Sequence, residues 1–223
     1  MNTNYRSPDL HALFEQFGTR KTYTRGQTIG SSDEPGLIVC MENGFIKRYM
    51  IRNEGTLDVQ IVYGPQDVFS LTQVYGELLG QSLYDGNEQF FYHTLTDVEL
   101  LHLRPNALRE AVADNPLLYR DLFSEAGYHL HTCVSRMESM SFHTTAQRAA
   151  HLLLYYAKKF GEPAANGVAI QFPLTHQTLA EVLDTTRETV TRAMIELRKQ
   201  GLITTGRHIV VRDVVRLSEA VYE

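Results

Sequence analysis

Cysteine is scarce in this chain of 223 residues, which contains only Cys40 and Cys133, far apart in the sequence. Two cysteines so placed form no disulfide framework, and they fit a reduced, cytoplasmic environment. They also cannot supply the roughly four thiolates that an iron–sulfur cluster needs. We therefore expect neither a disulfide-stabilised secreted domain nor an iron–sulfur protein.

Long apolar runs are missing as well. No stretch approaches membrane-spanning length and no signal-peptide pattern is present, so we expect no membrane segment and no secretion. An apolar fraction of 43% over 223 residues instead predicts one or two folded domains, each with a core large enough to need no disulfide or metal.

Positive charge is the third scarcity, since the formal net charge is −5. The deficit is unevenly spread. Residues 1–139 contain 11 Lys and Arg against 18 Asp and Glu, whereas residues 140–223 contain 10 against 8, which together make the totals of 21 and 26. The acidic excess belongs to the N-terminal part and the C-terminal part is mildly basic. This asymmetry indicates two domains with different tasks.

The C-terminal part contains two short amphipathic segments, from about Thr175 to Leu183 and from about Thr186 to Gln200. They predict two helices joined by a tight turn, which must share a buried seam because helices so short do not persist alone. We expect Thr175 and Thr185 as N-caps, with a capping box from Thr185 to Glu188. The inward sector of the second helix consists of Val190, Ala193, Met194 and Leu197.

The opposite sector of the second helix is polar near its start. Arg187, Glu188, Thr191 and Arg192 lie there, as a helix that reads base edges in a major groove requires. Beyond Gly201, residues 202–205 and 208–211 flank Gly206 and Arg207 and predict a β-hairpin, or wing. A helix pair followed by a hairpin favours a winged-helix DNA-binding domain over an ordinary helical hairpin with a charged face.

The chemistry of base edges assigns roles to these side chains. Arg187 and Arg192 suit guanine O6 and N7, and Glu188 suits cytosine N4. The side chains that we expect near phosphates are Thr175, His176, Thr186, Thr189, Thr191 and Arg207.

Between Lys21 and Arg104 the pattern changes to short strands separated by turns. Residues 37–41 and 45–51 flank Asn43-Gly44, which predicts a tight hairpin. Several such strands indicate a sandwich, a barrel or a jelly roll.

A long helix is predicted from about Asn115 to Ser139, and it carries two apolar stripes. One stripe should pack on the β domain and the other on a second copy in a two-fold dimer, although the pattern does not decide which. The seam candidates are Leu122, Ala126, His129, Leu130, Cys133, Val134 and Met137. If His129 and Cys133 meet their copies, they suit pH, thiol-redox or haem sensing, with plain packing as the simpler alternative.

The segments Thr186–Arg192, Leu197, Gly201–Ile203 and His208–Val211 resemble the CRP/FNR family of bacterial transcription regulators. One departure is Asp184, where the family usually has glycine in the turn; aspartate tolerates the left-handed conformation better than most residues. The resemblance implies an α+β chain: a cyclic-nucleotide-binding-like double-stranded β-roll at 1–114, a dimerisation helix at 115–140, and a winged helix-turn-helix domain at 141–223.

The effector pocket of the family is where the resemblance fails. Its cyclic-nucleotide sensors hold the ribose with Gly-Glu-Leu and the phosphate with a downstream Arg-Ser. Here Gly76-Glu77-Leu78 is followed by Asn87-Glu88-Gln89, and no Lys or Arg occurs from Asn53 to Leu103. A buried cyclic phosphodiester would lack its cation, so we do not expect control by cAMP.

No cofactor is required by the sequence, and haem, a metal or another small effector stays open. The candidate ligands are His93, His102, His129, His131 and Cys133, of which His129 and Cys133 are the preferred pair. We interpret His93 and His102 as strand residues on the surface of the β domain.

These observations predict a homodimeric regulator that binds a palindromic double-stranded operator of the TGTGA type implied by the family, with RNA polymerase as a further candidate partner. The sequence contains no nucleophile–base pair or carboxylate dyad, so we do not expect an enzyme. An alternative from another class is a β-roll that binds a small molecule or metal, with a winged helix that serves protein contacts.

Overall fold

The structure is a computed structural model that describes residues 7–30, 37–52, 55–80 and 90–222. The chain divides into two compact units. The first ends at His129 and the second begins at Leu130, inside the long helix α4 (Leu118–Ser141). Within the described ranges, no helix has both the length and the apolar character needed to cross a lipid bilayer.

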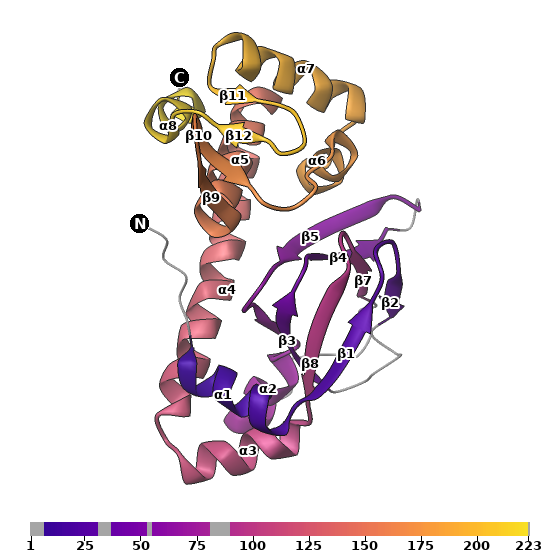
Figure 1. The fold of residues 1–223 in the computed structure, drawn as a ribbon, viewed down its shortest axis with the longest axis vertical. Helices are drawn as coiled ribbons and strands as arrows, with labels where there is room; N and C mark the ends of the chain where they lie inside the picture. Colours follow the sequence, from indigo (N-terminus) through magenta and orange to yellow (C-terminus); the bar gives the residue numbers. More distant parts are fainter. Residues whose placement is uncertain (1–6, 31–36, 53–54, 81–89, 223) are drawn as a thin grey trace. The chain divides into compact units, whose positions relative to one another are not determined.

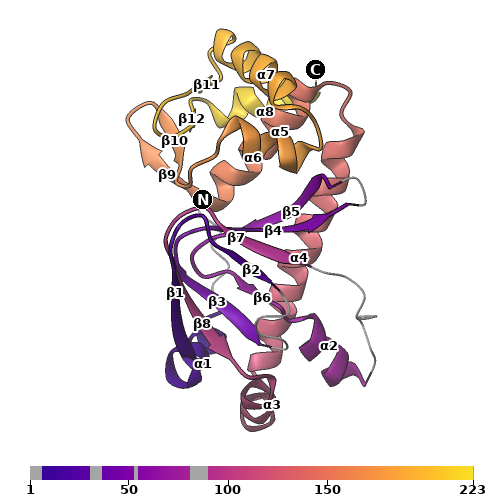
Figure 2. The same ribbon diagram turned by 90° about the vertical axis from the view of Figure 1, so that its right-hand side faces the viewer.

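The first unit is built from two four-stranded antiparallel sheets, which Figures 1 and 2 show as two layers. One sheet has the order β1 (Thr19–Tyr23), β8 (Val98–Leu103), β3 (Ile38–Asn43), β6 (Val68–Phe69). The other has the order β2 (Thr28–Gly30), β7 (Phe91–Thr94), β4 (Ile46–Ile51), β5 (Leu57–Tyr63). The short strands predicted a sandwich, a barrel or a jelly roll, and the two sheets form a sandwich.

Alternation along the strands divides the apolar side chains between two cores. Leu100 of β8 faces the inner core between the sheets, whereas its neighbours Leu101 and Leu103 face outward. The outer face is covered by α1 (Pro8–Phe17), α3 (Pro105–Asp114) and the start of α4. A further helix, α2 (Thr72–Leu79), contributes Val74 to the same outer core.

The connection at Asn43-Gly44 differs from the predicted hairpin. Strands β3 and β4 lie in different sheets, β3 between β8 and β6 and β4 between β7 and β5, so the chain crosses from one layer to the other here. Gly44 has φ of +84°, and a Cβ atom at this position would lie 2.2 Å from the carbonyl oxygen of Asp97. The dipeptide therefore correctly indicated a positive φ at Gly44, but it did not indicate which strands pair.

The composition of residues 161–167, which include Gly161, Pro163 and Asn166, predicts a surface loop, but β9 (Gly161–Ala164) pairs with β10 (Gly167–Ile170) as a hairpin. The segment 76–78, compared above with the ribose-binding Gly-Glu-Leu, lies within α2. The compared segment 87–89 lies outside the described residues.

Two buried carboxylates of α4 hold α1 in place. Asp121 Oδ2 accepts hydrogen bonds from the backbone N–H groups of Asp9, at 3.1 Å, and Leu10, at 3.2 Å. Ser7 directly before Pro8 is a pattern that predicts an N-cap, but the Ser7 hydroxyl does not cap α1 and donates instead to Glu125 Oε1 at 2.8 Å. The start of α1 is thus satisfied by a carboxylate from another helix, which also complements the helix dipole.

The second unit is organised around α5 (Thr145–Phe160), which packs against α6 (His176–Leu183), α7 (Arg187–Lys199) and α8 (Val214–Tyr222). Thr144 and Gln147 form a reciprocal capping box at the start of α5. A four-stranded sheet in the order β11 (Ile203–Thr204), β12 (Val210–Val211), β10, β9 completes the unit.

Two glycines of the first unit provide a matched test of the crossing at Gly44. Gly55 also has a positive φ, of 77°, but no described atom lies within 4 Å of a Cβ added there. Gly55→Ala should therefore lower the free energy of unfolding by about 1 kcal/mol from backbone strain alone. Gly44→Ala should lower it by about 1–3 kcal/mol more, because the backbone of Asp97 must also move. Urea unfolding of both variants measures the difference, and equal losses would refute the steric account.

Candidate nucleic-acid interface

The turn between α6 and α7 uses an aspartate where glycine is the easier choice. Thr175 caps α6, accepting a hydrogen bond from Thr178 N at 3.0 Å, as predicted. Asp184 ends the helix in the left-handed region with φ of 51° and ψ of 57°. Its N–H and that of Thr185 both donate to Ala180 O, which satisfies the last turn of the helix. The expectation that aspartate would sustain this turn is confirmed.

The start of α7 lies one residue later than predicted. Thr186, not Thr185, is the N-cap, and its hydroxyl accepts a hydrogen bond from Thr189 N at 3.2 Å. The third helical residue is therefore Thr189, and the predicted capping box with Glu188 is wrong. Glu188 lies in the first turn, where a carboxylate is favoured by the helix dipole, and its side chain is exposed.

Helix α7 has two distinct faces. Val190, Ala193, Met194 and Leu197 are buried, as the periodicity predicted. On the other side, Arg187, Glu188 and Arg192 are all exposed within the first two turns. Arg192 Nη2 donates to Thr189 Oγ1 at 3.2 Å, which draws the guanidinium toward the start of the helix.

Side chains that were expected near phosphates also join the two helices. His176 Nδ1 lies 3.0 Å from Thr191 Oγ1, and that hydroxyl donates to Arg187 O at 2.8 Å. Because the Thr191 proton is already used, His176 must donate through Nδ1–H. The hydroxyls of Thr175 and Thr186 are likewise used as caps.

Arg148 on α5 positions the helix pair α6 and α7, although no motif in the sequence indicates this role. Its Nη2 donates to the carbonyl oxygen of Leu183, in the last turn of α6. A cation at a helix C-terminus is favoured by the dipole and satisfies an orphan carbonyl. The residue lies 35 positions from its partner, so no local pattern indicates the contact.

The wing is confirmed as an antiparallel pair, with Ile203 opposite Val211 and Thr204 opposite Val210. The connection is the five residues 205–209 rather than the two residues predicted, and it carries the exposed side chain of Arg207. Because β12 also pairs with β10, the wing belongs to a four-stranded sheet, in which β11 is the edge strand.

The candidate sensor ligands are spread over the first unit and α4. His129 Nε2 lies 3.0 Å from Val68 O, and its ring meets Tyr63 edge-on, whereas Cys133 is exposed. His131 is exposed on α4, and His93 on β7 lies 3.1 Å from Thr28 Oγ1. Among the described residues, the potential metal ligands that come together are instead His11, Cys40 and Glu42.

His102 and Cys40 are both buried. The predicted surface position of His102 is wrong, because alternation along β8 puts its side chain on the inner face of the sheet with Val98 and Leu100. Burial, together with the charge of Lys21, lowers the pKa of His102 to about 4. Burial also raises the pKa of the Cys40 thiol, and the carboxylates of Glu42, Glu125, Asp67 and Glu15 raise it further.

The seam candidates on α4 differ in how much of each side chain is exposed. Leu122 is 2% exposed and lies in the outer core of its own β unit, so this residue is not free for a second chain. Leu130, Val134 and Met137 are 66%, 43% and 70% exposed, and Phe123 on the same stripe is 80% exposed. Cys133 is exposed, and Ala126 and His129 are half-buried. That these side chains form a dimer seam stays a prediction.

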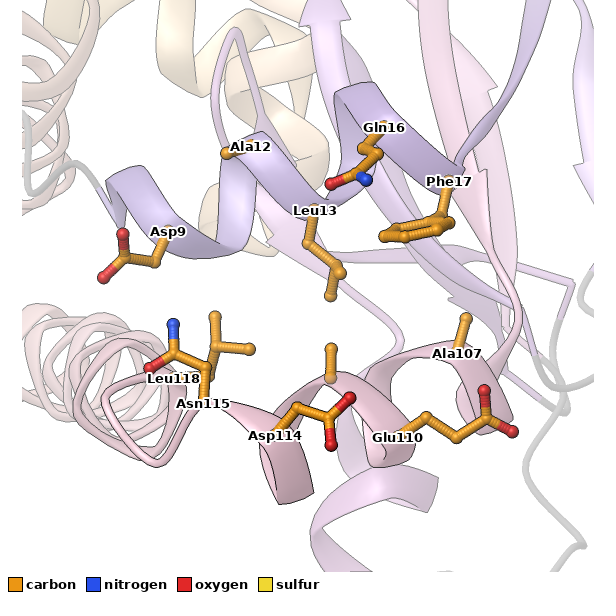
Figure 3. A pocket seen from close by; sticks show the side chains of 11 residues that line it. Asp9, Ala12, Leu13, Gln16, Phe17, Ala107, Glu110, Asp114, Asn115 and Leu118 are labelled. Carbon is orange, nitrogen blue, oxygen red and sulfur yellow. The ribbon is translucent and has the colours of Figure 1, made fainter.

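A groove of about 430 Å³ lies between α1 and α3 (Figure 3). Leu13 and Leu118 contribute to its apolar floor, and Asp9, Glu110 and Asp114 place carboxylates along it. This acidic groove belongs to the unit that carries the acidic excess, whereas the basic helix start of α7 belongs to the other unit.

The geometry of the second unit defines a winged-helix DNA-binding protein, with an exposed helix start on α7 and a wing anchored in a sheet. Residues 147–220 match the family model of the Crp-like helix-turn-helix domain. The global nitrogen regulator of Nostoc sp. is 32% identical over 203 residues, which cover 89% of this chain and 87% of the relative. The chain belongs to the CRP/FNR family of transcription regulators.

Two further comparisons agree with this assignment. The CRP-like cAMP-activated global transcriptional regulator of Mycobacterium tuberculosis is 26% identical over 199 residues, covering 88% of this chain and 85% of the relative. The structure of a CooA mutant from Carboxydothermus hydrogenoformans has a TM-score of 0.74 and 15% identity, covering 99% and 98% of the two chains. At that identity the likeness shows the fold alone. The family is one of regulators, not of enzymes.

The pKa of His102 generates a prediction about pH. Because the folded-state pKa of about 4 lies below the ordinary value of 6.5, the unfolded chain binds the proton first as the pH falls. Stability present above pH 6.5 is therefore lost between about pH 6.5 and pH 4. His102→Gln should lose less stability between pH 7 and pH 5 than the parent chain in urea unfolding. His143→Gln, at an exposed position, is the control, and equal losses in all three proteins would contradict the assignment.

Proposed function

We propose that this chain is a homodimeric, sequence-specific regulator that inserts α7 into successive major grooves of a palindromic operator. The observation that carries the proposal is the exposure of Arg187, Glu188 and Arg192 on one side of α7 while the other side is buried. A recognition helix needs this division, because the buried side fixes its orientation and the exposed side meets base edges.

The three exposed side chains have the chemistry of direct readout. Arg187 and Arg192 are suited to the O6 and N7 acceptors of guanine, and Glu188 to the N4 amino group of cytosine. The shifted N-cap supports the role of Glu188, because its carboxylate is not needed to cap α7. This donor and acceptor set fits a half-site of the TGTGA type.

Contacts to the phosphates are proposed for the residues around the helix starts and the wing. His176 is the first residue of α6, and its Nδ1 is held by Thr191, which fixes the ring beside the helix start. Thr175, Thr186 and Thr189 lie at the first turns of α6 and α7, where backbone N–H groups favour anions. Arg207 is the exposed cation of the wing.

A two-fold dimer is proposed through the exposed apolar stripe of α4. Phe123, Leu130, Val134 and Met137 recur at spacings of seven, four and three residues, so they share one helical face. Such a contiguous exposed stripe is unusual for a monomer and is satisfied when two copies of α4 meet. The dimer would present two recognition helices to two half-sites about one helical turn apart, roughly 34 Å.

The effector is proposed to be something other than a cyclic nucleotide. No Lys or Arg occurs between Asn53 and Leu103, which leaves that region without a cation for a buried phosphodiester. A relative described as cAMP-activated is 26% identical to this chain, and two proteins of such low identity can bind different ligands. Haem, a metal ion or another small molecule would act by shifting the populations of two dimer states.

Arginine substitutions on α7 test the readout. Arg187→Ala should weaken binding to a TGTGA-type palindrome by about 1–3 kcal/mol and relax the preference at one base pair. The matched control is Arg198→Ala, at an exposed position in the last turn of the same helix, which should change affinity little and selectivity not at all. Fluorescence anisotropy on the palindrome, on single-base variants and on a scrambled duplex gives both quantities.

The measured affinities distinguish base reading by Arg187 from phosphate contact and from no role in DNA binding. A loss confined to the palindrome supports base reading. A uniform loss on every duplex would mean that Arg187 contacts only phosphate. Unchanged affinity everywhere would contradict the proposal and favour a winged helix that serves protein contacts.

Charge on the α4 stripe tests the dimer. Leu130→Glu should raise the dimer dissociation constant at least about 100-fold, because an unpaired carboxylate would be buried at the seam. His131→Glu introduces the same charge at the next, exposed residue off the stripe and should leave the dimer intact. Sedimentation velocity over a concentration series measures both. A monomeric parent chain, or equal effects of the two substitutions, would exclude this seam.

A further inference from the structure

Three side chains with metal-ligand atoms meet on the outer face of the β unit, where α1 crosses β3. They are His11 of α1 and Cys40 and Glu42 of β3, and one ligand atom from each lies within 4.8 Å of the others. The cluster belongs to the first unit, whereas α7 belongs to the second, and its members include neither His129 nor Cys133.

A β-bulge brings Glu42 into this position. Met41 pairs with Leu100 and Asn43 pairs with Glu99, so Glu42 is the extra residue of β3 and has no partner on β8. Bulges re-aim side chains and recur beside functional sites. Glu42 is half-buried, so a small rotation of its side chain is not prevented by close packing.

The hydrogen bond made by Nε2 orients the imidazole of His11 so that Nδ1 can bind a metal. Nε2 lies 3.0 Å from the backbone oxygen of Gln66, which can only accept, so Nε2 carries the proton. The lone pair is then on Nδ1, which lies 3.5 Å from Cys40 Sγ. A histidine whose second nitrogen donates to a carbonyl is the usual arrangement of a metal ligand.

The loop that holds His11 is itself strained and fixed to β3. Gln66 has φ of 73°, and its N–H donates to Met41 O at 2.7 Å. Its side-chain oxygen Oε1 is buried without a hydrogen-bond partner among the described residues. Backbone strain of this kind persists where surrounding contacts enforce it, and it is concentrated at functional sites.

The spacing of nitrogen and sulfur fits a tetrahedral ion. Zn–N of about 2.1 Å and Zn–S of about 2.3 Å at the tetrahedral angle place the two atoms about 3.6 Å apart. The observed separation of His11 Nδ1 and Cys40 Sγ is 3.5 Å. The ligand atoms lie within 4.8 Å of one another, so the carboxylate of Glu42 needs to approach by at most about 1.3 Å to complete a three-ligand set of Zn²⁺ type.

The electrostatic surroundings favour a cation. Cys40 is fully buried, and the carboxylates of Glu42, Glu15, Asp67 and Glu125 act on its sulfur. A thiolate alone would be disfavoured among these charges. A divalent ion supplies the missing positive charge and stabilises the thiolate by direct coordination.

We propose that His11 Nδ1, Cys40 Sγ and a Glu42 carboxylate oxygen bind one divalent cation of the Zn²⁺ class, with water as the fourth ligand. Binding replaces the thiol proton, which is released to solvent, and forms the metal–sulfur bond without any change in oxidation state. The site goes beyond the proposed function and does not depend on it. It lies on α1, whose Asp9 and Leu10 amides are bound by Asp121 of α4, so the occupied site would fasten three elements together.

Metal titration of the full chain, stripped with a chelator, tests the site. Zn²⁺ competed against a chromophoric chelator should show one equivalent per chain. Co²⁺ should give the near-ultraviolet absorption of a cobalt–thiolate bond. Cys133→Ser is the matched control because it removes the exposed cysteine, and it should behave as the parent chain. Cys40→Ser should lose the cobalt–thiolate absorption.

Two further variants decide the matter if Cys40→Ser does not fold. His11→Gln and Glu42→Gln change half-buried side chains, and each should weaken Zn²⁺ binding by more than about tenfold while circular dichroism stays unchanged. The proposal is overturned if the parent chain binds no Zn²⁺, if Cys133→Ser abolishes the absorption, or if both glutamine variants bind as tightly as the parent chain.

Discussion

The buried seam between α5, α6 and α7 is the constraint on which the DNA-binding unit depends. Helices of 8 and 13 residues gain too little from their own hydrogen bonds to persist in water. Val190 and Leu197 are buried on the inner side of α7, and Arg148 of α5 binds the end of α6. Because this packing fixes the rotation of α7 about its axis, it also decides which side chains face outward. The exposed arginines are a consequence of the core beneath them.

In the β unit, a different interaction has the same organising effect. Asp121 and Glu125 are buried carboxylates on the same side of α4 as Leu118 and Leu122, and they bind the start of α1. This fixes α1 across the outer face of β3, which places His11 beside Cys40. Breaking such a buried, charge-assisted contact would leave unsatisfied groups behind, so the position of α1 is strongly specified.

The features that could be predicted from the sequence are those that depend on residues close together in the chain. The two C-terminal helices, the left-handed Asp184 and the wing follow from periodicity, capping and turn residues within about 40 positions. The predictions were wrong where the structure depends on residues that are far apart in the sequence. Asn43-Gly44 indicates a positive φ at Gly44 but carries no information on the strands that pair with β3 and β4. Likewise, Leu122 belongs to an apolar stripe, but only the packed unit shows which stripe its own sheet covers. His11 and Cys40 are 29 residues apart, without a motif to connect them.

We propose that a dimer reads two half-sites with the exposed start of α7. The most direct test is selection of bound duplexes from a random library by the purified full chain, followed by sequencing. An inverted repeat should be enriched, with guanine and cytosine at the most selective positions of each half and centres about one helical turn apart, roughly 10 base pairs. Enrichment of a single unrepeated motif, or of no motif at low salt, would contradict it.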